Sequence, residues 1–220
     1  MLYEMKKAVQ AFHRPGIDTS PWRMVRNVAP YYLPGELKVS SPLTIYWSIN
    51  SVCNLRCKMC DVGMFNEEGM FFKNLRIDRK LHEVDIEVFK RVVDEVKDDK
   101  PFMALNSTEP LMYKPLAEAI AYCTENGLKT GVTTGAYTLP RQAQALAEAG
   151  LSRLSVSMDG PPDIHNHIRG RKDSFEQAYA GVEAFAAASR KLGRRPEIYL
   201  NCTITNMNHH RLVEFYKAIE

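Results

Sequence analysis

The stretch "LTIYWSINSVCNLRCKMCDVG", residues 43–63, joins a strand-like segment to three closely spaced cysteines. Residues 43–50 are rich in β-branched and aromatic side chains, which predicts a β-strand. Cys53, Cys57 and Cys60 follow that strand within ten residues. We therefore expect the loop after this strand to carry chemistry.

The strand-like segment is the first of a repeating series. Strand patterns lie at 43–50, 102–107, 129–136, 153–160 and 197–205. Helical patterns lie at 85–96, 114–127, 140–150, 174–193 and 209–220. Strict alternation of this kind predicts an α/β fold with a parallel sheet and helical crossovers. An open doubly wound sheet and a (β/α) barrel are both compatible with it.

Both folds place functional residues at the carboxyl ends of the strands. The unusual residues of this sequence follow those ends: the cysteine loop, "NSTEP" at 106–110 and "SMDG" at 157–160. One end of the sheet is therefore expected to hold the site.

Length and composition are those of a globular domain. The 220 residues carry a net charge of +3 without a basic run, so we expect no nucleic-acid partner. No apolar stretch reaches the ~20 residues of a membrane span, and no signal peptide is recognisable. We expect a cytoplasmic protein with reduced thiols. Residues 1–42, with five prolines, are expected to form an irregular arm, and residues 43–220 the main domain.

Several sites use clustered thiolates. A structural zinc site normally has four protein ligands, and no fourth Cys or His lies at a suitable spacing. "CKMC" alone could be a redox pair, but this leaves Cys53 unexplained. A [4Fe–4S] cluster held by three thiolates would leave one iron open for chemistry.

The Cys-x₃-Cys-x₂-Cys spacing resembles the signature of the radical S-adenosylmethionine (radical SAM) enzymes. The resemblance implies that Cys53, Cys57 and Cys60 hold a [4Fe–4S] cluster, whose fourth iron is chelated by S-adenosylmethionine. It also implies reductive cleavage of S-adenosylmethionine to a 5′-deoxyadenosyl radical, which abstracts hydrogen from a substrate. The implied fold is a partial TIM-like (β/α)₆ barrel.

Further residues extend the resemblance. Glu109 and Pro110 match a Gly-Gly-Glu-Pro stretch that binds the methionine amino group, with Ser107 and Thr108 in place of the glycines. The alternative for "STEP" is a helix N-cap.

The segment 155–170 is similar to the fourth-strand region of the SPASM subgroup. That similarity assigns Ser157 and Arg169 to the methionine carboxylate. Met59 occupies the position of an aromatic residue near the adenine. We interpret His165 and His167 as loop residues that close this segment.

The family barrel has six strand–helix units, and five are recognisable here. We therefore expect the sixth unit and any C-terminal domain to lie beyond these 220 residues. The implied partners are a reductant such as flavodoxin or ferredoxin and an unidentified peptide, sugar nucleotide or small metabolite. A non-enzymatic iron–sulfur protein for electron transfer or redox sensing is the alternative function.

Overall fold

The computed structural model describes residues 25, 27–32, 41–74, 82–106 and 108–219. The expected N-terminal arm, residues 1–42, falls mostly outside this part. Its described portion includes a short 3₁₀ helix, η1 (Ala29–Tyr31).

A five-stranded parallel sheet forms the centre of the fold. Its strands are β1 (Thr44–Ser48), β2 (Phe102–Asn106), β3 (Thr130–Thr134), β4 (Arg153–Ser157) and β5 (Glu197–Asn201), and their spatial order follows the sequence. In the described residues β1 and β5 are the edges, so the sheet is an arc of five strands. This arc is consistent with the expected partial TIM-like barrel.

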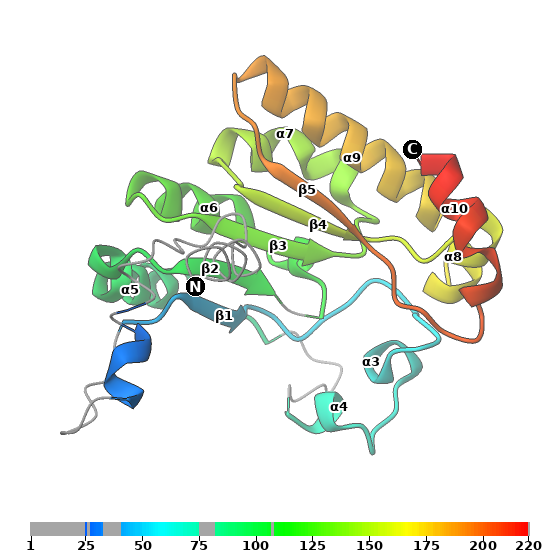
Figure 1. Cartoon of the computed structure of the whole chain (residues 1–220), viewed down its shortest axis with the longest axis horizontal. Helices are drawn as coiled ribbons and strands as arrows, with labels where there is room; N and C mark the ends of the chain where they lie inside the picture. Colours follow the sequence, from blue (N-terminus) through cyan, green and yellow to red (C-terminus); the bar gives the residue numbers. More distant parts are fainter. Residues whose placement is uncertain (1–24, 26, 33–40, 75–81, 107, 220) are drawn as a thin grey trace.

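Four helices cover one face of the sheet (Figure 1): α5 (Ile86–Val96), α6 (Leu116–Glu125), α7 (Leu139–Ala149) and α9 (Ser174–Lys191). Local signals fix their ends. The Asp85 side chain caps α5 by accepting from the Glu87 and Val88 amides. Gly150 ends α7 with a left-handed φ of 89°, a conformation that glycine adopts without steric cost. The helices predicted at 85–96, 114–127, 140–150 and 174–193 are confirmed within two residues at each end.

The hydrophobic core lies between the sheet and these helices. Leu105, Leu154 and Val156 are fully buried there, together with Phe89 of α5 and Phe185 of α9. Full burial of a large apolar side chain contributes about 1.5–3 kcal/mol. Because strand side chains alternate between faces, the opposite face carries a polar set: Ser48, Asn106, Ser155, Ser157 and Asn201. We call it the inner face.

Large side chains fill the amino end of the inner face. The Arg153 guanidinium lies 4.6 Å from the centroid of the Phe102 ring, and its Nε lies 2.9 Å from Glu197 Oε2. Gly131 of β3 makes room for them, because a Cβ there would lie 2.6 Å from Phe102 Cζ.

Shorter elements gather beyond the carboxyl ends of the strands (Figure 1). They are α3 (Asp61–Met64), α4 (Met70–Asn74), η3 (Pro110–Met112), α8 (Pro162–Arg169), η4 (His209–Arg211) and α10 (Leu212–Ile219); a further turn, η2 (Lys97–Asp99), follows α5. Interpreting His165 and His167 as loop residues was wrong, since both lie on α8. This helix has only eight residues, too few for a clear apolar period.

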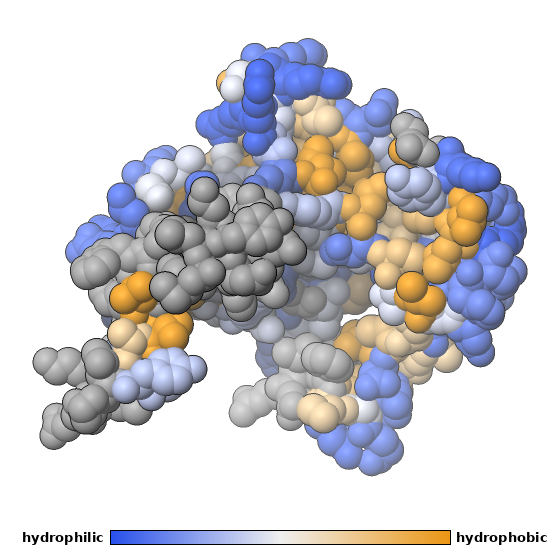
Figure 2. All heavy atoms as spheres, viewed as in Figure 1, coloured by the Kyte–Doolittle hydropathy of each residue, from blue (hydrophilic) through white to orange (hydrophobic). Residues whose placement is uncertain are grey.

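Apolar residues reach the surface along β5 and α10, where Figure 2 shows orange gathered. Leu200, Ile204 and Val213 are 40, 68 and 71 % exposed. Exposed apolar groups of this kind are typical of contact surfaces. Among the described helices, none has the length and apolar character needed to cross a bilayer.

Candidate functional site

The cysteine loop connects β1 to α3 and is held by backbone hydrogen bonds. The Arg56 and Lys58 amides donate to the Arg169 and Ile168 carbonyls at the end of α8, at 3.1 and 2.8 Å. Gly63 of α3 lies so close that a Cβ there would be 2.6 Å from the Cys57 nitrogen. The loop is therefore clamped between two helices.

One cavity of about 390 Å³ brings together most of the expected site. Its lining includes the three cysteines Cys53, Cys57 and Cys60, together with Met59, Thr108, Glu109 and Arg169. These residues come from three segments of the chain, each following the carboxyl end of a different strand. Ser157 ends β4 on the inner face and is not among the lining residues. Ser107 lies outside the described residues.

The arrangement of the thiols distinguishes between metal sites. All three are free of disulfides. In the described part of the chain, no three Cys, His, Asp or Glu side chains converge closely enough to hold one metal ion. Zinc requires its sulfur ligands ~2.3 Å from a common centre, whereas the thiolates of a [4Fe–4S] cluster bind different irons. Three thiols in one loop are the donor set of a [4Fe–4S] cluster with one open iron, whereas a structural zinc site normally has four protein ligands.

Burial disfavours the thiolate form of two of the cysteines in the metal-free protein. It raises the pKa of Cys53 to about 12. It also raises the pKa of Cys57, against an opposing effect of the nearby Arg169 guanidinium. Because metal ligands must be thiolates, cluster binding has to displace these protons.

Glu109 is buried, with 2 % of its surface exposed. Its Oε1 accepts from the Leu111 amide at 3.1 Å and from the Thr134 hydroxyl at 2.5 Å. Its Oε2 accepts from the Gly135 amide at 2.9 Å. Burial raises the pKa of Glu109, against the lowering effect of these donors. A carboxylate offers about four acceptor positions, so one position on Oε2 is left for a ligand.

The structure supports the alternative interpretation of "STEP" as an N-cap. Glu109 occupies the N-cap of η3 and accepts from Leu111, so one carboxylate both starts this turn and lines the cavity. Thr108 lines the same cavity and also has a structural contact. Its hydroxyl bonds to the Val52 carbonyl and to Asn50 Oδ1, which ties the cysteine loop to the loop after β2.

Arg169 contributes a positive charge to the cavity. It is paired with Asp159, a partner that was not predicted from the sequence. Its Nε lies 2.6 Å from Oδ2 of Asp159, whose side chain is fully buried. Its Nη1 donates to the Cys57 sulfur across 3.6 Å. The other Asp159 oxygen, Oδ1, accepts from the Thr203 amide at 3.2 Å. The ion pair leaves the remaining guanidinium nitrogens available to a carboxylate.

Thr134 is a functional candidate that sequence reasoning missed, and Asp159, within the segment 155–170, was assigned no role from the sequence. Asp159 was visible as a carboxylate directly after a buried strand and ten residues before an arginine. Thr134 carried no signal, because threonine is common in strands. Its contact with Glu109 depends on the alignment of two neighbouring strands.

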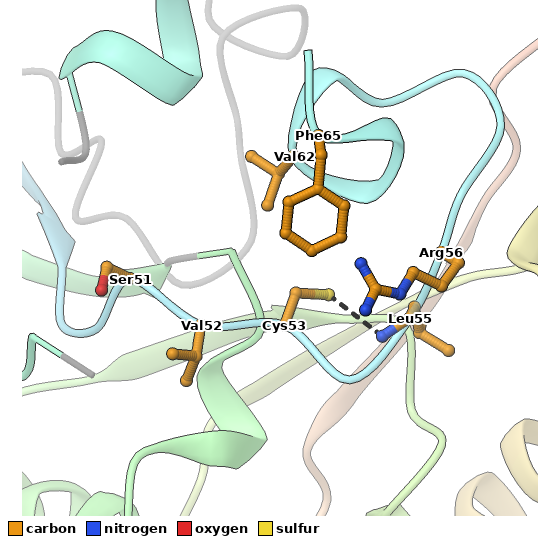
Figure 3. Close-up of a pocket in the computed structure, with 7 residues that line it drawn as sticks. All are labelled: Ser51, Val52, Cys53, Leu55, Arg56, Val62 and Phe65. Carbon is orange, nitrogen blue, oxygen red and sulfur yellow. Dashed lines mark hydrogen bonds between the residues drawn. The ribbon is translucent and has the colours of Figure 1, made fainter. Parts of the chain in front are cut away.

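A second cavity, of about 380 Å³, lies on another side of the cysteine loop. Figure 3 shows Val62 and Phe65 facing Cys53 and Arg56 across it. The Arg56 guanidinium lies 4.1 Å from the centroid of the Phe65 ring. The cavity thus places an aromatic ring and the cation packed against it next to Cys53.

Residues 47–218 match the model of the radical SAM superfamily. The chain therefore belongs to this superfamily of enzymes, which use a [4Fe–4S] cluster and S-adenosylmethionine.

Its sequence is 28 % identical over 194 residues to an AdoMet-dependent heme synthase of Nitratidesulfovibrio vulgaris, covering 85 % of this chain and 48 % of the relative. It is 29 % identical over 168 residues to an Fe-coproporphyrin III synthase of Methanosarcina barkeri, covering 76 % and 39 %. The chain thus spans less than half the length of these relatives.

The fold is similar to that of Streptococcus suis SuiB bound to S-adenosylmethionine, with a TM-score of 0.61 and 18 % identity over 98 % of this chain and 47 % of SuiB.

Proposed function

We propose that this chain is the catalytic domain of a radical SAM enzyme that abstracts hydrogen from its substrate. When bound, the cluster and S-adenosylmethionine supply a 5′-deoxyadenosyl radical for that step. The observation that carries the proposal is the shared cavity, where three cysteines, a buried glutamate and a buried arginine meet. An electron-transfer protein has no use for Glu109 and Arg169 beside the cysteines, so the enzymatic interpretation is favoured.

The chain's own residues divide the binding task. Cys53, Cys57 and Cys60 would hold three irons. Glu109, with its one remaining acceptor position, would bind the methionine ammonium, and Arg169 the methionine carboxylate, by charge-assisted hydrogen bonds. Met59 would border the adenine with a polarisable side chain. Ser157, at the end of β4, would add a hydroxyl to the carboxylate site.

The test is anaerobic cluster reconstitution, with dithionite and S-adenosylmethionine added and 5′-deoxyadenosine measured by mass. The Cys57→Ala variant should bind little iron and form no product. Cys123→Ala is the matched control, because Cys123 is fully buried in the core and should leave both readouts intact. Iron-loaded protein that forms no 5′-deoxyadenosine would contradict the enzymatic proposal.

For the substrate we propose an anionic tetrapyrrole, the class named in the relatives' products. The second cavity supports this, since Arg56 would offer a cation to the carboxylates of a macrocycle, and Phe65, which packs against that guanidinium, an apolar wall beside it. Titration with Fe-coproporphyrin III should change its absorbance spectrum, and Arg56→Gln should weaken that binding. Equal binding by Arg56→Gln would remove the cavity from the substrate site, and no binding by wild type would favour a peptide or nucleotide substrate.

A further inference from the structure

A group of basic side chains borders the cysteine loop on its solvent side. It consists of Lys58, His167, Arg171 and Lys172, all exposed, and we call it the basic patch. Lys58 Nζ lies 2.8 Å from His167 Nε2. Arg171 donates through Nε and Nη2 to the Asn54 carbonyl at 3.1 and 2.6 Å. The patch is thus connected to the segment between Cys53 and Cys57.

The positive charge of the patch is not neutralised in the described part of the chain. No ion pair there involves Lys58, Arg171 or Lys172. By contrast, Lys90 and Arg211 are each paired with two carboxylates.

Two acids adjoin the patch and are bonded to neutral donors. Asp173 accepts from the Tyr137 hydroxyl at 3.0 Å, and Glu176 from the Asn166 amide at 3.2 Å. Both carboxylates keep their charge and offset part of the patch, but the three cations outnumber them, so the surface beside the loop keeps a net positive charge. Unpaired charges of one sign raise the association rate of an oppositely charged partner.

We propose that the basic patch is the docking surface for a small acidic electron-carrier protein. This inference rests on the proposed function, which requires one electron for each S-adenosylmethionine cleaved. That electron leaves the reduced flavin or iron–sulfur centre of the carrier, which is oxidised by one electron, and enters the cluster bound by this chain. The position of the patch carries the proposal, since Lys58 follows Cys57 directly and Arg171 holds the carbonyl next to Cys53.

A nucleic acid is the other polyanion that such a surface could attract. Binding of single strands uses exposed aromatic faces on which bases stack. The aromatic ring at this surface, Tyr137, lies 5.2 Å from the Arg171 guanidinium and donates its hydroxyl to Asp173. The ring is thus already engaged, which favours a protein partner.

The first test measures binding. The cluster-loaded chain is titrated with oxidised flavodoxin, and Kd is measured at low and high salt. Lys172→Glu should weaken binding about tenfold at low salt, and the difference should shrink as salt screens the charges. Lys129→Glu is the matched control, because Lys129 is exposed immediately before β3, at the opposite end of the strands. Equal affinity of wild type and Lys172→Glu would overturn the proposal, as would an equal loss in Lys129→Glu.

The second test separates docking from chemistry. With flavodoxin as donor, Lys172→Glu should form 5′-deoxyadenosine more slowly than wild type, and with dithionite at the same rate. Slowing with both reductants would overturn the proposal, because the cluster itself would then be perturbed. A single-stranded oligonucleotide that displaces flavodoxin from this chain as effectively as unlabelled flavodoxin does would also overturn the proposal. No product from wild type with dithionite would instead contradict the proposed function, while the binding measurement would still decide the docking surface.

Discussion

The Arg169 guanidinium donates to the Cys57 sulfur across 3.6 Å while it is paired with Asp159. This contact joins the loop after β1 to the helix after β4, which are 112 residues apart in sequence. A fixed positive charge beside a thiol favours the thiolate that a metal requires. The same arginine thus links the cysteine loop, the cavity and the fourth strand.

Asp159→Asn should destabilise the protein strongly, because Arg169 would keep its charge in a buried position without a partner. Removal of one member of a buried ion pair costs about 3–5 kcal/mol. The comparison is Asp163→Asn, which removes an exposed partner of Arg211 and should change stability little. Urea unfolding of the metal-free proteins measures both. A similar decrease in the free energy of unfolding in both variants would show that the buried Asp159–Arg169 pair stabilises the fold no more than the exposed pair does.

Gly63→Ala should reduce iron retention after reconstitution. The added Cβ would lie 2.6 and 2.7 Å from the Cys57 nitrogen and oxygen, so α3 or the cysteine loop must move. Met64→Ala, on the same helix and 58 % exposed in the native chain, should retain iron. If Gly63→Ala binds as much iron as wild type, the close approach of α3 does not hold the cysteine loop in place.

Glu109→Gln should weaken S-adenosylmethionine binding, measured by equilibrium dialysis on cluster-loaded protein. The variant loses the negative charge and turns an amide NH₂ toward donors such as the Gly135 amide. A buried donor left unsatisfied costs about 1–3 kcal/mol. Thr134→Val removes one hydrogen bond to the same carboxylate and should have a smaller effect. A larger loss in Thr134→Val than in Glu109→Gln would contradict this assignment.

Stability should fall in acid because of His165. Burial and the nearby Arg169 lower the pKa of His165 to about 3. Between about pH 6.5 and pH 3 the unfolded chain binds a proton that the folded chain does not, so stability decreases as pH falls. The slope is about 1.4 kcal/mol per pH unit in this window, so the loss between pH 7.5 and pH 5 is about 2 kcal/mol.

His165→Asn isolates this contribution from other groups. Glu109 has a raised pKa and acts in the opposite direction, but it is present in both proteins. Free energies of unfolding of wild type and His165→Asn, measured in urea at pH 7.5 and pH 5, should differ by about 2 kcal/mol less at the lower pH. A difference that does not change with pH would show that His165 titrates normally in the folded state.

Much of this fold could be predicted from sequence because its signals are local. Alternating patterns identified all five strands, and helical patterns located the helices between them. The three cysteines and Glu109 could be predicted because each directly follows a strand, where parallel folds place their sites. The structure brings them together in one cavity at the carboxyl end of the strands, as expected for residues that follow parallel strands.

Other features depend on contacts between distant segments. Asp159 and Arg169 form an ion pair through the geometry of α8, a helix too short to be recognised from its periodicity. The bond from Thr134 to Glu109 depends on how β2 and β3 align. The second cavity, with Arg56 above Phe65, depends on how α3 turns back over the loop. No residue pattern within a single segment encodes these relationships.

Three side chains fill the amino end of the inner face: Arg153, Phe102 and Glu197. With that end filled, molecules would reach the cysteines from the carboxyl end of the strands. Reactants and spent products must then share the same entrance. The products of one turnover would have to leave before the next substrate could bind. The fold would therefore set the order in which substrates bind and products leave.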